Sequence, residues 1–200
     1  MDLHKLNMRI FSKPIEYNIN NVNKVMVYCF AQNISMIEHM VSGLKQHNIH
    51  TVHIIKNTKE ISGVANYEEI EKKYKELGIS VIPIPFFEET INTKKESNKV
   101  IDYAVMNKID NIIICAPTFH ILRATLTIIS SAIQKGFNIN FSSIIVNISN
   151  WNTLCITQQG STKEAFHNLL ELELDRIYEY TKNGDILAFK VIWNYLDKFV

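Results

Sequence analysis

Short apolar runs alternate with segments of helical character along most of this chain, and this alternation limits the fold more than any other feature. The apolar runs lie at residues 24–30, 50–56, 79–85, 111–115 and 141–148. Strands that alternate with helices indicate βαβ units, and such units build a parallel sheet with right-handed crossovers. We therefore predict an α/β fold: a Rossmann-like, doubly wound domain with a mostly parallel five-stranded sheet.

Helices are predicted between these runs and after the last one. The first begins at about residue 35 and has residues 36, 40, 41 and 44 on one face, and the others cover about residues 67–77, 93–107, 122–135, 162–182 and 185–199. Ser35 and Asn66 are expected to cap two of them, and Thr93 with Glu96 has the spacing of a capping box. The chain is then a single domain over 1–200, with a weakly patterned N-terminal extension (1–22), a polar loop (149–161) and a C-terminal helical pair (162–200).

Charge and cysteine content exclude several classes of partner. Twenty-one basic and 20 acidic residues give a net charge of +1, so the usual electrostatic footprint for nucleic acid or an anionic membrane is absent. The most apolar region, 112–133, contains Pro117, His120 and Arg123, and no signal-like segment begins the chain. Three widely spaced cysteines suit a reducing compartment. We expect a cytoplasmic protein with neither a nucleic-acid nor a membrane partner.

The predicted topology also gives a default position for a ligand. In the common doubly wound order, strands 24–30 and 111–115 lie side by side at the topological switch point, and ligands bind beyond their carboxyl ends. The loops that face this crevice would be 31–35 and 116–120. Ala31, Gln32, Pro117 and Thr118 are therefore candidate ligand-binding residues.

His120 and Arg123 are the strongest candidates for chemistry. Three residues apart at the start of a helix, they share one face and can converge on one anion. The free N–H groups of that first turn also attract a phosphate or carboxylate. The alternative is that His120 caps or packs locally while Arg123 pairs with a surface acid. Spacing alone favours neither interpretation.

The segment after the third strand is a candidate lid over the same crevice. Glu88, Asn92, Thr93 and Glu96 offer carboxylate, amide and hydroxyl groups for acid–base work or for holding a hydroxylated ligand. The alternative is a solvated loop followed by a capping box, and Glu96 alone favours this second interpretation.

Absent motifs remove the commonest enzyme classes. The chain has no G-x-G-x-x-G after its first strand, no P-loop and no G-x-S-x-G elbow. Its seven histidines form no H-x-x-x-H pair and its cysteines no C-x-x-C pair, so no metal site is expected. Cys115 is expected to point into the core, which makes a Cys–His nucleophile a minor alternative.

Several short motifs resemble the YdcF-like (ElyC/SanA/YdcF) family, a group largely of unknown function. The matching pieces are the strand K-V-M-V-Y-C-F (24–30), Gly63 before Asn66, Asn92-Thr93, the turn P-T-F-H-I-L-R (117–123), and a tail with Trp151, Gln159-Gly160, E-L-D-R-I-Y (173–178), N-G-D-I (183–186) and Tyr195-Leu196. The resemblance covers about residues 24–199.

This resemblance implies a domain that binds a small anionic or nucleotide-like molecule, with S-adenosylmethionine or a nucleotide as the candidate ligand. With the residues argued above, His120, Arg123 and Glu88 are the candidate catalytic residues, and the matching tail adds Gln159 and Gly160 to the candidate ligand-binding residues. The resemblance leaves open whether the domain is an enzyme. The chain lacks the family's glycine at the end of the first strand, which motivates the alternative of a non-catalytic accessory or interaction protein with a degenerate site.

An apolar stripe runs through the predicted C-terminal helices. It consists of Ile177, Leu187, Phe189, Ile192, Trp193 and Leu196. A stripe of this kind either covers the sheet or forms a homodimer face, and packing on the core is its commoner use.

Overall fold

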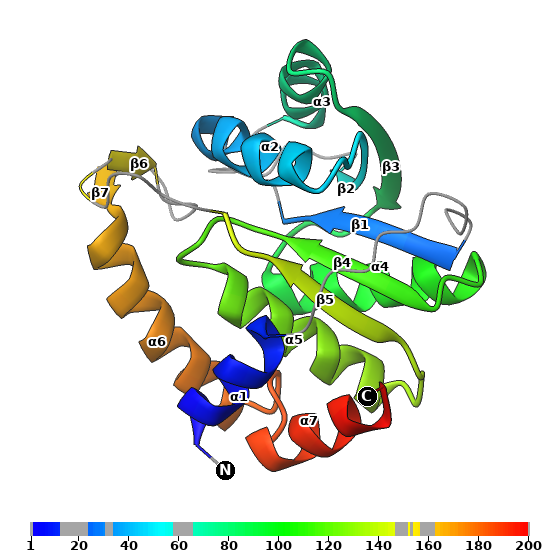
Figure 1. The fold of residues 1–200 in the computed structure, drawn as a ribbon, viewed down its shortest axis with the longest axis vertical. Helices are drawn as coiled ribbons and strands as arrows, with labels where there is room; N and C mark the ends of the chain where they lie inside the picture. The colour runs from blue at the N-terminus through cyan, green and yellow to red at the C-terminus, as the bar shows by residue number, and fades with distance from the viewer. Residues whose placement is uncertain are drawn as a thin grey trace.

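The computed structural model of this protein describes residues 2–12, 24–30, 34–57, 66–146, 152, 154–156 and 163–199. Its centre is a five-stranded sheet in the order β3-β2-β1-β4-β5, and every neighbouring pair is parallel (Figure 1). The strands are β1 (Val25–Cys29), β2 (Thr51–Asn57), β3 (Ser80–Phe86), β4 (Asn111–Cys115) and β5 (Asn140–Ile144). The predicted α/β class and the predicted doubly wound strand order are both confirmed.

Helices cover both faces of this sheet. They are α1 (Leu3–Phe11), α2 (Ile37–Gln46), α3 (Tyr67–Glu76), α4 (Thr93–Met106), α5 (Ile121–Gln134), α6 (Phe166–Lys182) and α7 (Phe189–Leu196), with 3-10 turns at Ile34–Met36 and Asp197–Phe199. Helices α2 and α3 lie on one side of the sheet, and α4, α5, α1 and α7 lie on the other (Figure 1).

The alternation of side chains along β1 shows why the sheet needs both layers. Met26, Tyr28 and Phe30 belong to the core beneath α4 and α5, whereas Val27 and Cys29 belong to the core beneath α2 and α3. Successive residues of a strand point to opposite faces, so a strand covered on both sides must be apolar throughout. Burial on both faces therefore explains the near-continuous apolar run at 24–30.

Helix starts follow local capping chemistry, with two corrections to the expected residues. Asn66 caps α3 as predicted, because its side chain accepts a hydrogen bond from the backbone N–H of Glu68. The cap of α4 is Asn92, which accepts from Lys95 N at 2.9 Å, so the predicted capping box beginning at Thr93 is wrong by one residue. The predicted cap at Ser35 is also wrong, because a 3-10 turn over Ile34–Met36 precedes α2.

The sequence interpretation missed one helix and two short strands. Leu3–Phe11 forms helix α1, capped by Asp2, within what was predicted as a weakly patterned extension. Leu154–Ile156 (β6) and Lys163–Ala165 (β7) form an antiparallel ribbon, so the predicted polar loop at 149–161 contains a strand and α6 begins only at Phe166. Strands of three residues are too short to show a period, and their pairing partner is not encoded locally.

The C-terminal helices pack on the core, as the commoner interpretation of their stripe predicted. Ile177, Ile192 and Leu196 are buried in the core, while Leu187, Phe189 and Trp193 are partly buried against it. The Tyr195 hydroxyl accepts a hydrogen bond from Ile139 N (2.7 Å) and lies 2.8 Å from Ile139 O. These contacts attach α7 to the start of β5.

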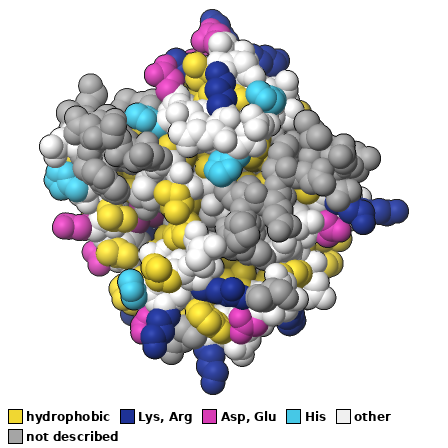
Figure 2. Space-filling model, viewed as in Figure 1, with side chains coloured by type: hydrophobic (Ala, Val, Ile, Leu, Met, Phe, Trp, Pro, Cys, Tyr) yellow, Lys and Arg dark blue, Asp and Glu magenta, His cyan; other side chains and the backbone are white. Residues whose placement is uncertain are grey.

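The described surface carries charges of both signs. On the face in Figure 2, acidic and basic side chains are interspersed over α3 at the top and along the lower edge. Within the described ranges, no helix combines the length and the apolar character that crossing a bilayer requires.

Candidate functional site

The candidate site begins where β1 and β4 end. The two strands pair in register through Cys29 and Cys115, and Phe30 N donates a hydrogen bond to Cys115 O at 2.9 Å. The strands leave the sheet side by side and their helices lie on opposite faces, which defines the topological switch point. The predicted adjacency of these two strands is confirmed.

Local hydrogen bonds shape the turn from β4 into α5. The carbonyl of Pro117 accepts from His120 N (2.8 Å) and from Ile121 N (3.0 Å), which closes the turn. The Thr118 hydroxyl donates to Val146 O at 2.5 Å and so ties the turn to the chain after β5. His120 occupies the N-cap position of α5, and its side chain makes no capping bond. The imidazole is therefore available for other contacts.

Both candidate side chains of this turn meet the carboxylate of Glu173, which comes from α6. His120 Nδ1 lies 3.1 Å from Glu173 Oε2, and Arg123 places Nε 2.6 Å from Oε2 and Nη2 3.0 Å from Oε1. Arg123 is 5% exposed and Glu173 is 2% exposed. His120 and Arg123 thus converge on one anion, and in this structure that anion is the protein's own Glu173. The alternative interpretation, in which Arg123 pairs with a surface acid, is wrong about the acid, because Glu173 is buried.

Two further side chains complete what we call the buried charge cluster: Thr93, His120, Arg123, Glu173 and Arg176. Arg123 Nη1 donates to the Thr93 hydroxyl at 2.7 Å, and Arg176 Nη1 donates to Glu173 Oε1 at 2.6 Å. The guanidinium of Arg123 also lies 5.0 Å from the ring centre of Tyr180, a cation–π distance. The cluster therefore joins α4, α5 and α6.

The charge states within the cluster follow from burial and from these contacts. Burial opposes ionisation of Glu173, but the contacts with His120 and Arg123 outweigh it and hold the pKa of this carboxyl well below its ordinary 4.5. Burial, followed by the charge of Arg123, lowers the pKa of His120 below 6.5. At neutral pH the cluster therefore contains an ionised Glu173 beside a neutral imidazole.

A second buried acid lies close to the cluster. Tyr28 Oη donates to Glu96 Oε1 at 2.5 Å, and both side chains are buried. Burial raises the pKa of Glu96 to about 8, although the Tyr28 hydrogen bond and the Arg123 charge act in the opposite direction. Glu96 therefore carries a proton at neutral pH and points into the core from α4, whereas both sequence interpretations had placed it in a lid or in a capping box.

The remaining predicted lid residues have other partners. The half-exposed side chain of Glu88 forms an ion pair with Lys95 at 2.9 Å, on the outer side of the helix start. Asn92 is engaged in capping α4. Thr93 is the lid residue that reaches the buried charge cluster, through its bond to Arg123.

Four of the predicted ligand-binding residues lie outside the described residues: Ala31, Gln32, Gln159 and Gly160. Among the residues that the structure does describe, no group of three His, Cys, Asp or Glu side chains is placed to hold a metal ion. Cys29 and Cys115 are buried free thiols.

Sequence reasoning missed Glu173, although a signal for it existed. Leu169 and Ile177 are four residues before and after it, and both are buried on the inner face of α6. A glutamate in phase with an apolar face is unusual, because burying a carboxylate is costly unless a cation meets it. The spacing of Glu173 from Leu169 and Ile177 could therefore have indicated that its carboxylate faces inward.

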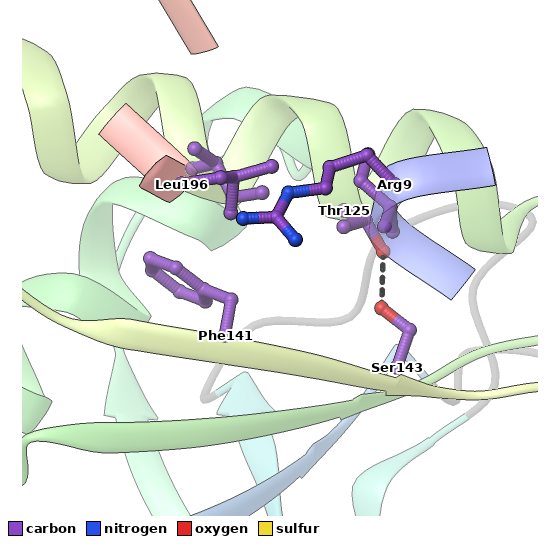
Figure 3. A pocket seen from close by; sticks show the side chains of 7 residues that line it. Arg9, Thr125, Phe141, Ser143 and Leu196 are labelled. Atoms are coloured by element: carbon purple, nitrogen blue, oxygen red, sulfur yellow. Dashed lines mark hydrogen bonds between the residues drawn. The ribbon is translucent and has the colours of Figure 1, made fainter. Parts of the chain in front are cut away.

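A small cavity lies elsewhere, between α1, α5, α7 and β5 (Figure 3). Its volume is about 10 Å³, enough for about one water molecule. Arg9, Phe141 and Leu196 border it, and the Thr125 and Ser143 hydroxyls form a 2.9 Å hydrogen bond at its edge. Its size excludes a metabolite.

Comparison with protein-family models found no match to the chain, and comparison with curated proteins found none either. Among solved structures, the chain is similar to an isoflavone reductase (14% identity, TM-score 0.38, 80% of this chain and 46% of that one). It is also similar to a short chain dehydrogenase from Mycobacterium thermoresistibile (13% identity, TM-score 0.34, 83% of this chain and 65% of that one). The chain spans less than two thirds of either protein, and function is argued below from the site itself.

Proposed function

We propose that this chain is a YdcF-like α/β domain that binds a small anionic or nucleotide-like molecule at the carboxyl ends of β1 and β4. The observation that carries the proposal is the position of the buried charge cluster. His120 and two guanidinium groups gather where these strands end, next to the turn that begins α5. Cationic and imidazole groups at a switch point favour an anionic ligand.

S-adenosylmethionine and nucleotides are the first ligands to test. Both carry groups that suit this site: a carboxylate or phosphates for the cationic groups, and a ribose with hydroxyl groups for polar contacts. The resemblance of residues 24–199 to the YdcF-like family points to the same ligand classes, and localisation in the cytoplasm would give access to them.

A second function, that of a non-catalytic accessory protein, is favoured by a different observation. Nε and Nη2 of the Arg123 guanidinium donate hydrogen bonds to Glu173, and Nη1 donates a hydrogen bond to Thr93. A guanidinium used in this way holds three helices together and has little capacity left for a ligand. In this alternative the cluster is a structural tie that replaced a binding site.

Ligand-induced stabilisation separates the two functions. The full chain is heated alone and with each of S-adenosylmethionine, ATP, GTP and inorganic phosphate, and positive results are titrated by calorimetry. A ligand that binds the folded state raises the unfolding temperature, and a concentration of about 100 times Kd adds about 2.7 kcal/mol. A rise with one compound supports the proposed function, whereas no rise with any of them supports the accessory function.

The matched variants are His120→Ala in the site and His47→Ala on the surface. His47 is exposed at the end of α2, so its loss is expected to leave affinity unchanged. His120→Ala is expected to weaken binding at least tenfold, because a hydrogen bond to the ligand is worth about 1.5 kcal/mol when one group is charged. Equal affinity of both variants would remove His120 from the site.

A further inference from the structure

The two nitrogens of the His120 ring are in different surroundings. Nδ1 lies 3.1 Å from Glu173 Oε2, the same oxygen that accepts the Nε–H of Arg123. An ionised carboxylate only accepts hydrogen bonds, so an unprotonated Nδ1 would direct its lone pair at those of the oxygen. The contact is therefore favourable only when Nδ1 carries a hydrogen.

The opposite nitrogen, Nε2, makes no hydrogen bond with any residue the structure describes. The side chain of His120 is 12% exposed, while that of Glu173 is 3% exposed. The imidazole therefore contacts a buried carboxylate and is itself partly exposed to solvent.

We propose that Glu173 and His120 form a carboxylate–imidazole pair in which Glu173 holds His120 as the Nδ1–H tautomer, so that Nε2 serves as a general base for a hydroxyl group or water bound in the crevice. This inference rests on the proposed ligand site and adds a reaction class to it, proton abstraction. His120 is the catalytic residue and Glu173 the positioning residue. Glu173 was not among the residues predicted from sequence.

The proton transfer is balanced within these groups. The O–H bond of the bound hydroxyl or water breaks, its electron pair stays on the oxygen, and the proton bonds to Nε2. The imidazolium that results keeps its Nδ1–H directed at the carboxylate of Glu173, which stabilises the new positive charge. No other reactant is required.

The groups packed around the ring are arranged for this role. Arg123 from α5 and Arg176 from α6 both contact Glu173 and hold its carboxylate in one orientation. Phe30, after β1, meets the ring edge to face with centroids 5.7 Å apart, which limits rotation of the imidazole. The two guanidinium charges favour the neutral ring, whereas Glu173 favours the protonated ring.

Nitrogen NMR of the full chain labelled with 15N-histidine tests the pair without a ligand. Seven histidines are present, and His120→Gln identifies the signal of interest. We expect a neutral Nδ1–H ring at pH about 7, with a pKa below the ordinary value of about 6.5. In Glu173→Gln the pKa of His120 is expected to fall further, because the charge that stabilises the imidazolium is gone. An Nε2–H ring in the unmodified protein would overturn the inference.

Glu171→Gln is the matched control, because Glu171 is exposed on the same helix. It is expected to leave both the tautomer and the pKa of His120 unchanged, and an equal effect of the two variants would contradict a positioning role. If Glu173→Gln does not fold, Glu173→Asp keeps the charge and should give a pKa between those expected. A ligand screen without binding would contradict the proposed function, whereas ligand binding to an Nε2–H ring would overturn the base assignment alone.

Discussion

The guanidinium of Arg123 and the carboxylate of Glu173 form a two-pronged ion pair in the interior, with contacts of 2.6 and 3.0 Å between residues 50 positions apart in the chain. Such a pair fixes α6 against α5 with one geometry, because a planar guanidinium matches a carboxylate only in the plane of both. Desolvation offsets much of the attraction. The pair therefore affects the free energy of unfolding most clearly when one partner is removed and the other stays buried without it.

Arg123→Ala is expected to lower the free energy of unfolding by about 3–5 kcal/mol, because it leaves the buried carboxylate of Glu173 without its main partner. Urea denaturation followed by circular dichroism measures the change. The control is Lys72→Ala, which removes an exposed pair at 4.0 Å with Glu76 and should change stability little. Replacing both partners, Arg123→Met with Glu173→Leu, should recover most of the loss. A loss no larger than that of the control would contradict this account.

A fall in pH should weaken the folded state through protonation of Glu173. Its pKa in the folded protein is below the 4.5 expected when unfolded, so the ionised form contributes stability above about pH 4.5. That contribution is lost as pH falls below about 4.5, because the unfolded chain then binds a proton that the folded chain does not. Glu173→Gln should be less stable at neutral pH and should lose less on acidification. The free energy of unfolding, measured across this range, would refute the assignment if both proteins showed the same slope.

A rise in pH should weaken the folded state through Glu96, whose pKa is raised where that of Glu173 is lowered. Its folded pKa of about 8 lies above the ordinary 4.5, so the folded chain retains a proton that the unfolded chain has released. The contribution of Glu96 to stability is then greatest below about pH 4.5 and falls as pH rises towards 8. Glu96→Gln should remove this part of the slope, whereas Glu69→Gln, on the exposed side of α3, should retain it. Tyr28→Phe should raise the pKa of Glu96 further, since the lost hydrogen bond lowers it.

The strand order and the switch point could be predicted because each of the five main strands is an apolar run of its own. Strands β1 and β4, buried on both faces, are written as V-M-V-Y-C and N-I-I-I-C, and they pair residue by residue from Val25 to Cys29. For such a series the doubly wound order is the common solution, so the adjacency of β1 and β4 followed. The local sequence was enough to locate β1 and β4, because each residue that is buried in these two strands is itself apolar.

The contents of the site could be predicted only in part, because they depend on which helices meet. His120 and Arg123 were found from their place after β4, but their shared partner lies on α6. No local pattern states that α6 crosses α5 at that turn. Glu96 was misplaced for a related reason: its spacing from Thr93 resembles a cap, and only the packing of α4 against Tyr28 reveals it as a buried acid.

Helix α1 depends on packing for its stability, since a nine-residue helix is marginal alone in water. Leu6 on its inner face is fully buried, and Met8 on its outer face is 61% exposed. Leu6→Ala should therefore lower the free energy of unfolding by about 2–5 kcal/mol, as large-to-small core changes do. Met8→Ala should have little effect, and urea denaturation of both variants compares them. If residues 1–22 were a detachable extension, neither substitution would change the transition, and α1 would not be part of the core.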